Sequence, residues 1–312
     1  MNDAGIYVTT DHLVGLEALA RDLRFVQKAR SHRHLAGRMQ SAMRGRGLIF
    51  EELRDYLPGD DIRSIDWRVT ARTGKPAVRV YGEEKERPAI LVVDQRINMF
   101  FGSRRSMKSV TAAEAAALCA WRILGSGDRV GGFVFNDRAI EQIKPHRSRN
   151  AVIALADTIA KQNKELRADD GRAGGGGQLD AVLNTVANVA RHDHLIVVIS
   201  DYQGHSALTR DTMLRLSGHN DVVCLLVYDP FLLELPRSGR IVVSGGGPQA
   251  ELALRTGSVR TPISAFARSR GEELLAWQQE LGLPMLPIST AEETAPQLTR
   301  VLEQSAWRQR RR

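Results

Sequence analysis

Short, wholly apolar runs alternate with longer amphipathic segments from residue 88 onward. The runs AILVVD at 89–94, LIVVIS at 195–200 and DVVCLLVYD at 221–229 are typical of strands covered on both faces. Segments with apolar residues three and four positions apart predict helices, at 107–124, 149–162, 179–191, 206–217, 262–282 and 294–307. Further strands are expected at 129–135, 138–143 and 285–288, with a hairpin over 241–254. Repeated strand–helix units predict an α/β fold with a doubly wound, mostly parallel sheet.

The first 88 residues follow a different pattern. Residues 11–30 carry apolar side chains at helical spacing, so an amphipathic N-terminal helix is expected, followed by a basic loop. In the next segment, Asp60 is expected to cap a helix that Gly74 ends, and Ala77–Tyr81 alternates as a strand does. The expected organisation has four parts. They are an N-terminal helix and basic loop (1–50), a small signature segment (51–88), a main α/β domain (89–307) and a basic tail (308–312).

Positive charge is concentrated in two places. The net charge is +8, with eight basic side chains and one acidic side chain over residues 21–50 and four arginines among the last five residues. Such segments bind nucleic acid, anionic lipid or an acidic protein, and they are also typical of a solvated helix face and a tail. Only Phe25 and Phe50 accompany the charges of residues 21–50, so base stacking is not expected there.

Cys119 and Cys224 each lie within an apolar run, which predicts two buried thiols and a reducing compartment. No CxxC or Cys/His spacing indicates a zinc site. No stretch reaches the roughly 18 apolar residues of a membrane-spanning helix, and residues 1–20 lack the charge pattern of a signal peptide. We therefore expect a cytoplasmic protein.

Asp94 and Asp201 stand at the carboxyl ends of two of the predicted central strands. Asp94 follows AILVV, and Asp201 follows LIVVIS. Ligands bind beside the carboxyl ends of the strands in an open α/β sheet, so these carboxylates converge if their strands are neighbours. Two convergent carboxylates with nearby hydroxyls are typical of a Mg²⁺ site. The alternative is that each aspartate only caps the turn that follows it.

The run FEELRDYLPGDDIRSIDWRVTAR, followed by AILVVD, resembles the bacterial "domain of unknown function" family number 58. Members of that family are commonly encoded beside MoxR-type AAA+ ATPases, and the resemblance covers residues 45–300. It implies a von Willebrand factor A-like domain, in which an Asp-x-Ser-x-Ser loop, a threonine and a second aspartate bind a divalent cation. The implied partners are a MoxR-type ATPase and its client proteins.

The corresponding positions of this chain depart from that cation site. The first loop reads DQRIN from Asp94, so Arg96 and Asn98 stand at the two hydroxyl positions, and Gln178 stands where the threonine is expected. A guanidinium has no acceptor lone pair and cannot bind Mg²⁺. Arg96 is therefore expected to lie between Asp94 and Asp201 and to neutralise both. No cofactor is expected, and Mg²⁺ held by the two aspartates and water is the less favoured alternative.

Two further patterns receive structural interpretations. GSRRSMKS at 102–109 resembles a phosphate-binding loop but has Met107, whose side chain obstructs the tight turn, in place of the second glycine. Nucleotide binding is therefore not expected there. The acidic and basic side chains that follow residue 50 nearly balance, and such pairing lowers carboxylate pKa values instead of preparing an acid/base pair. We expect an ion-pair network with the indole packed beneath it, formed by Arg54, Asp60, Asp61, Arg63, Asp66, Trp67 and Arg72.

These patterns favour a non-enzymatic protein-interaction module, an adaptor for a MoxR-type ATPase with a degenerate cation site. The histidines show no HExxH spacing, and no GxSxG elbow occurs. The loop after the first central strand is expected to carry the interaction surface, formed by Phe100, Phe101, Arg104 and Arg105. One of the two phenylalanines is expected to turn into the core. The alternatives are a nucleic-acid-binding protein using residues 21–50 and the arginine tail, and a divalent-metal-dependent hydrolase.

Overall fold

A mostly parallel, six-stranded sheet forms the centre of the larger of two units in the computed structural model. The larger unit comprises Met1–Arg30 and Arg87–Arg312, and the smaller unit comprises Ser31–Glu86. The structure describes residues 5–23, 48–83, 87–167, 177–233, 235, 240–243, 250–253, 265, 269, 271–274 and 276–309.

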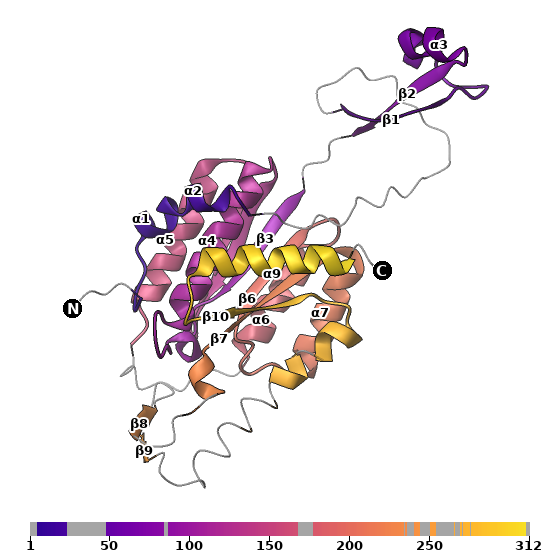
Figure 1. Cartoon of the computed structure of the whole chain (residues 1–312). Coiled ribbons are helices and arrows are strands. Elements are labelled where there is room, and N and C mark those ends of the chain that lie inside the picture. Colours follow the sequence, from indigo (N-terminus) through magenta and orange to yellow (C-terminus); the bar gives the residue numbers. More distant parts are fainter. Residues whose placement is uncertain are drawn as a thin grey trace. The chain divides into compact units, whose positions relative to one another are not determined.

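The strand order of the central sheet is β10-β7-β6-β3-β4-β5 (Figure 1). Its strands span Pro88–Asp94 (β3), Arg129–Phe135 (β4), Ile140–His146 (β5), Leu195–Ser200 (β6), Asp221–Tyr228 (β7) and Met285–Ser289 (β10). β5 pairs antiparallel with β4, and the other pairs are parallel. Every residue of β3 after Pro88 is buried, as an apolar run between two helical layers requires. The predicted doubly wound α/β fold is confirmed.

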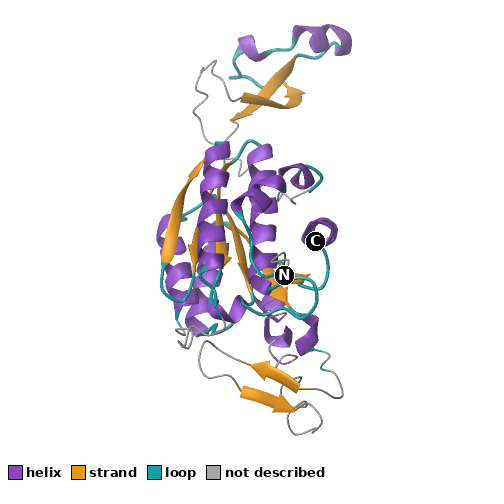
Figure 2. Ribbon diagram, turned by 90° about the vertical axis from the view of Figure 1, so that its left-hand side faces the viewer, coloured by secondary structure: helices purple, strands orange, loops and turns teal. Residues whose placement is uncertain are grey.

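Helices cover both faces of this sheet (Figure 2). The first layer contains Lys108–Gly125 (α4), Arg149–Lys164 (α5) and Thr294–Gln309 (α9), and the second contains Gln178–Val189 (α6) and Ala207–His219 (α7). Successive residues of β3 face opposite layers, so Leu91 packs with the first layer and Val92 with the second. Cys119 and Cys224 are both buried, as predicted, and burial raises the pKa of the Cys224 thiol to about 12.

The N-terminal segment packs against the first layer. It forms two short helices, Thr10–Gly15 (α1) and Glu17–Ala20 (α2), in place of the single helix expected over 11–30, whose last residues lie outside the described ranges. Leu13 and Leu23 are buried in the core that they share with α4. Trp121 Nε1 on α4 donates a hydrogen bond to the carbonyl oxygen of Leu13 at 3.1 Å. These contacts make the segment part of the larger unit.

The smaller unit contains a two-stranded antiparallel sheet and a short helix. Its elements are Leu48–Asp55 (β1), Ile62–Ser64 (η1), Trp67–Thr73 (α3) and Ala77–Glu83 (β2). Asp66, and not Asp60 as expected, caps α3, while Gly74 ends it at a φ of 71°, as predicted. The sequence pattern missed β1 because a register shift between Phe50 and Glu52 breaks the alternation of its side chains.

A hairpin and two 3₁₀ turns are among the other features of the described residues. Arg240–Val243 (β8) and Ala250–Ala253 (β9) form the predicted hairpin. Single 3₁₀ turns span Ile97–Met99 (η2) and Pro230–Leu232 (η3). Within the described ranges, no helix combines the length and the apolar character needed to cross a membrane.

Candidate functional site

The carboxyl ends of β3 and β6 lie side by side, because these strands are parallel neighbours in the sheet. Asp94 ends β3, and Asp201 directly follows β6. Both residues are buried. The strand order therefore brings together the two aspartates that the sequence pattern singled out. We call Asp94, Arg96, Asn98, Lys108 and Asp201 the strand-end site.

Arg96 forms a bidentate ion pair with Asp94. Arg96 Nε donates to Asp94 Oδ1 at 3.0 Å, and Arg96 Nη2 donates to Asp94 Oδ2 at 2.6 Å. The Ser200 hydroxyl donates to the same carboxylate at 2.6 Å. Burial disfavours a charged guanidinium, but the attraction of Asp94 outweighs burial and raises the pKa of Arg96 above its usual value. Arg96 is therefore a permanent cation held on the Asp94 carboxylate.

A different cation neutralises Asp201. Lys108 Nζ donates to Asp201 Oδ2 at 2.5 Å, and Asn98 Nδ2 donates to Asp201 Oδ1 at 2.7 Å. The remaining nitrogen of Arg96, Nη1, donates to the main-chain oxygen of Gln203 at 2.9 Å. The hydrogen bonds of the Arg96 guanidinium to a carboxylate go to Asp94, while a lysine from the start of α4 reaches Asp201. The attraction of Asp201 still contributes to the raised pKa of Arg96, as an arginine near both carboxylates was expected to show.

Lys108 is the functional residue that sequence reasoning missed, because it was grouped with the phosphate-loop-like stretch 102–109. A signal was present, since Lys108 is the first residue of an 18-residue helix. The helix dipole disfavours a cation at that end, so a buried carboxylate partner is expected there. In the same stretch, the N–H and hydroxyl of Ser103 donate to Asp229 at 2.8 Å and 2.6 Å, which supports a structural role for the loop.

Gln178 and Asp137 lie beside the strand-end site. Gln178 is the first residue of α6, and its Nε2 donates to the main-chain oxygen of Asp137 at 3.3 Å. Asp137 Oδ2 accepts from the N–H of Ile97 at 2.7 Å. Burial raises the pKa of Asp137 above its ordinary value. The Gln178 amide thus holds the loop that follows β4.

The side chains of the strand-end site do not fit Mg²⁺. Mg²⁺ requires oxygen ligands in a near-octahedral arrangement, whereas Asp94 and Asp201 each bind a buried cationic side chain. Arg96 and Lys108 would repel a metal cation placed between the carboxylates. Among the residues that the structure describes, no group of three or more His, Cys, Asp or Glu side chains is arranged to hold a metal ion.

The expected interaction surface is more buried than its sequence indicated. Phe100 packs against Tyr7 with ring centroids 5.6 Å apart, and Phe101 packs against Phe231 with centroids 6.4 Å apart. Both phenylalanines are half-buried, so both are partly turned inward, where only one was expected to be. Two exposed cationic side chains remain in the same loop, Arg104 and Arg105.

In the smaller unit, members of the expected ion-pair network form local contacts. Arg54 binds both carboxylate oxygens of Asp60 at 2.7 Å. Arg79 Nε donates to Asp66 at 2.8 Å, and this hydrogen bond lowers the pKa of Asp66. Trp67 is 64% exposed, so the expectation of an indole packed beneath the network is wrong. Among the residues of the smaller unit that the structure describes, two strands, a 3₁₀ turn and one short helix provide no second layer to cover an indole.

The remaining expected members of that network lie at the surface. Asp61 caps η1 by accepting from the N–H of Arg63 at 2.9 Å. Asp61, Arg63 and Arg72 are all exposed. Three other segments lie outside the described residues. They are most of the basic segment (24–47), a glycine-rich stretch (168–176) and the end of the arginine tail (310–312).

The chain has relatives among known proteins. The family model described as "Protein of unknown function DUF58" matches residues 52–273, more than half of the chain. The chain is 28% identical over 277 residues to "Uncharacterized protein Rv1480" of Mycobacterium tuberculosis (strain ATCC 25618 / H37Rv), covering 88% of this chain and 85% of that protein. The same values hold for "Uncharacterized protein Mb1516" of Mycobacterium bovis.

Two solved structures are also similar. One is the conserved hypothetical protein BatB from Bacteroides thetaiotaomicron, at 12% identity and a TM-score of 0.39, covering 71% of this chain and 98% of that one. The other is an aerotolerance-related membrane protein from Bacteroides fragilis NCTC 9343 carrying multiple mutations to serine, at 15% identity and a TM-score of 0.38, covering 69% of this chain and 98% of that one.

Proposed function

The chain belongs to the DUF58 family, and from this premise we propose that it is a non-enzymatic protein-interaction module. In this proposal it is a cytoplasmic, von Willebrand factor A-like adaptor for a MoxR-type AAA+ ATPase, and it uses no metal cofactor. The observation that carries the proposal is the pair of buried ion pairs at the strand ends, Arg96–Asp94 and Lys108–Asp201. They occupy the edge of the sheet where an open α/β fold binds ligands.

A hydrolase at this edge would need a carboxylate that is free to accept a proton or to bind a cation. Asp94 instead accepts hydrogen bonds from Arg96 and Ser200, and Asp201 accepts them from Lys108 and Asn98. A fully satisfied buried network holds the strand ends and their loops in one arrangement. These contacts support a scaffold that presents a fixed surface over one that performs chemistry.

The loop after β3 is the surface that we assign to the ATPase. Its two exposed arginines, Arg104 and Arg105, lie close in sequence to the half-buried rings of Phe100 and Phe101. Arginine and aromatic side chains are enriched at the energetic centres of protein interfaces. The partner itself is implied by the family, and an acidic face on that ATPase would complement the loop.

Binding of the full chain to a MoxR-type ATPase of the same organism tests the proposal. We expect binding by biolayer interferometry, and we expect Arg104→Glu to weaken it by about tenfold without changing the thermal melting curve. Arg104→Glu with Arg105→Glu should weaken it further. Lys144→Glu with Arg191→Glu is the control, because both residues are exposed and lie outside the loop. Unchanged ATPase binding by the loop variants would overturn the surface assignment.

The nucleic-acid alternative predicts a different ranking of variants. Charge reversal at Arg30, Arg33 and Arg38 would then abolish binding to a DNA or RNA duplex, and wild-type affinity would fall steeply with salt. Two results together would replace the adaptor proposal by the nucleic-acid one. The wild-type chain would fail to bind the ATPase, and it would bind a duplex in a salt-sensitive manner that this triple variant loses.

A further inference from the structure

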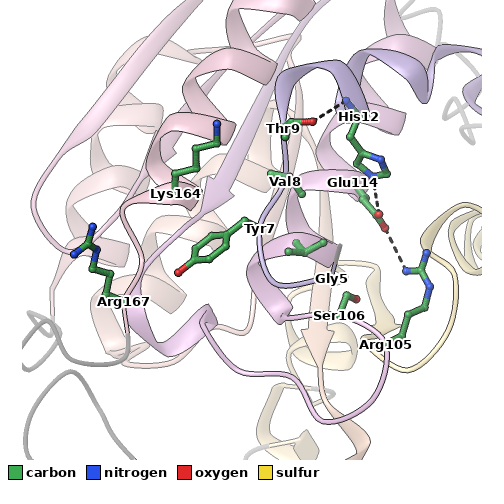
Figure 3. Close-up of a pocket in the computed structure, with 11 residues that line it drawn as sticks. Gly5, Tyr7, Val8, Thr9, His12, Arg105, Ser106, Glu114, Lys164 and Arg167 are labelled. Carbon is green, nitrogen blue, oxygen red and sulfur yellow. Dashed lines mark hydrogen bonds and ion pairs between the residues drawn. The ribbon is translucent and has the colours of Figure 1, made fainter. Parts of the chain in front are cut away.

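A cavity of about 950 Å³ lies beside the N-terminal segment and apart from the strand-end site (Figure 3). It is bounded by the N-terminal segment, by the beginning of α4 with the loop before it, and by the end of α5. Its volume is in the range of sites that bind small ligands or short peptides. The charged and aromatic side chains that line it are Tyr7, His12, Arg105, Glu114, Lys164 and Arg167.

One side of this cavity is close to electrostatic balance. Glu114 is a buried carboxylate that accepts from His12 Nε2 at 2.9 Å and from the Thr294 hydroxyl, with Arg105 Nη1 at 3.6 Å. Burial disfavours the charged carboxylate, but His12 and Thr294 outweigh burial and lower the pKa of Glu114. This side therefore offers hydrogen-bonding groups with little excess charge.

The opposite side is positively charged. Figure 3 shows Lys164 and Arg167 on one side of Tyr7, with His12, Glu114 and Arg105 on the other. Lys164 and Arg167 are exposed, and neither has an acidic partner among the described residues. The partial negative charge at the carboxyl end of α5 favours a cation there, which accounts for the position of Lys164 at the last residue of that helix.

We propose that this cavity binds a short acidic segment of a partner protein. The carboxylates of that segment pair with Lys164 and Arg167, and its main-chain amides face the His12–Glu114 side. The His12–Glu114 side carries little excess charge and offers hydrogen-bonding groups, which the main-chain amides of a peptide can match. The inference rests on the proposed function, since it names the chemistry of a protein partner.

The wall of the cavity is pre-organised by a buried relay of amides. The N–H of Val8 donates to Asn163 Oδ1 at 2.9 Å, and Asn163 Nδ2 donates to Gln95 Oε1 at 2.9 Å. Gln95 lies between Asp94 and Arg96 in the sequence, so the relay fastens the N-terminal segment to the strand-end site. A wall fixed in advance lowers the entropy lost when a peptide binds.

Fluorescence polarisation with the full chain tests this proposal, using labelled tetraglutamate as the probe and labelled tetraglutamine as its neutral match. We expect tetraglutamate to bind at least about tenfold more tightly than tetraglutamine. Lys164→Glu with Arg167→Glu should remove that difference, and the milder Lys164→Gln with Arg167→Gln should reduce it. Lys144→Glu with Arg191→Glu, which changes the net charge equally outside the cavity, should leave it within about twofold. Melting curves verify that each variant is folded.

Several results would overturn the assignment. These are equal binding of the two peptides, no saturable binding of tetraglutamate, and equal weakening by the cavity variants and by the control. Displacement of tetraglutamate by a lower concentration of tripolyphosphate would assign the cavity to a phosphate ligand instead. The assay contains no ATPase, so its result is independent of whether the chain binds that protein.

Discussion

The strand-end site and the cavity beside the N-terminal segment both contain a carboxylate paired with a cationic side chain, but they differ in exposure. The side chains of Arg96 and Asp94 are 4% and 0% exposed, whereas those of His12 and Glu114 are 47% and 8% exposed. Without water as an alternative partner, the first pair has one stable arrangement. The second pair can exchange partners with solvent or a ligand. The comparison teaches that burial decides whether an ion pair is held in one arrangement or is open to solvent.

The largest effect is expected at Arg96. Arg96→Ala leaves Asp94 buried without its cation, which should lower the free energy of unfolding by about 3–5 kcal/mol in urea denaturation. Arg300→Ala is the control, because Arg300 and Glu292 form a pair in which both side chains are 56% exposed. Its effect should stay below about 1 kcal/mol.

A double variant separates the lost ion pair from lost packing. Asp94→Asn with Arg96→Met removes both charges, so it should be more stable than Arg96→Ala alone. If Arg96→Ala is as stable as the wild-type chain, the strand-end site is not the fixed scaffold on which the proposed function rests.

A smaller effect is expected at Lys108. Lys108→Met removes the cation on Asp201, but the Asp201 side chain is 8% exposed, whereas that of Asp94 is 0% exposed, and the attraction of Arg96 for Asp201 remains. We therefore expect a loss of about 2 kcal/mol in the same denaturation experiment. A loss equal to that of Arg96→Ala would show that neither the partial exposure of Asp201 nor the attraction of Arg96 compensates for the lost lysine.

The exposed pair of the cavity should give a still smaller, pH-dependent effect. The hydrogen bond to Glu114 raises the pKa of His12, against the opposing effects of burial and Arg105. A raised folded pKa means that the His12 contribution is complete below the unfolded value of 6.5 and is lost as pH rises through the folded pKa. Because His12 is half-exposed, solvent screening keeps this contribution below about 1 kcal/mol.

Unfolding curves of the wild-type chain and His12→Gln at several pH values measure this contribution. The stability difference between them should shrink as pH rises from 6 to 9. His192→Gln is the control, since the His192 side chain is 75% exposed and its partner Asp193 is 89% exposed. A difference that is constant over this range would mean that His12 contributes through packing and not through its charge.

The smallest effect is expected from divalent cations. Because Arg96 and Lys108 occupy the two carboxylates, millimolar Mg²⁺ or Mn²⁺ should leave the melting temperature unchanged. Titration calorimetry should show no binding tighter than about the millimolar range. A one-site isotherm in the micromolar range would place a metal ion among these side chains. The strand-end site would then bind a ligand, and it would no longer differ from the cavity in that respect.

The sequence predicted much of the fold because its central strands are apolar on both faces. AILVVD and LIVVIS became β3 and β6, and the helices expected at 107–124, 149–162, 179–191 and 206–217 appeared within a few residues of those positions as α4, α5, α6 and α7. The helix expected over 262–282 lies partly outside the described residues. Prediction was weaker in the smaller unit. There a bulge between Phe50 and Glu52 interrupts the side-chain alternation by which β1 could have been predicted. Trp67 is exposed because the described residues of that unit form no layer that covers it.

For the strand-end site, the sequence by itself determined the chemistry of one loop. An arginine two residues after Asp94 excludes a hydroxyl ligand and predicts an internal ion pair, since both residues lie on one short stretch of chain. Only the tertiary structure decided which cation meets Asp201. Lys108 reaches that carboxylate because the parallel pairing of β3 and β6 places residues 93 positions apart at one sheet edge. The cavity has the same origin, since its lining comes from three segments whose proximity depends on packing and not on any local pattern.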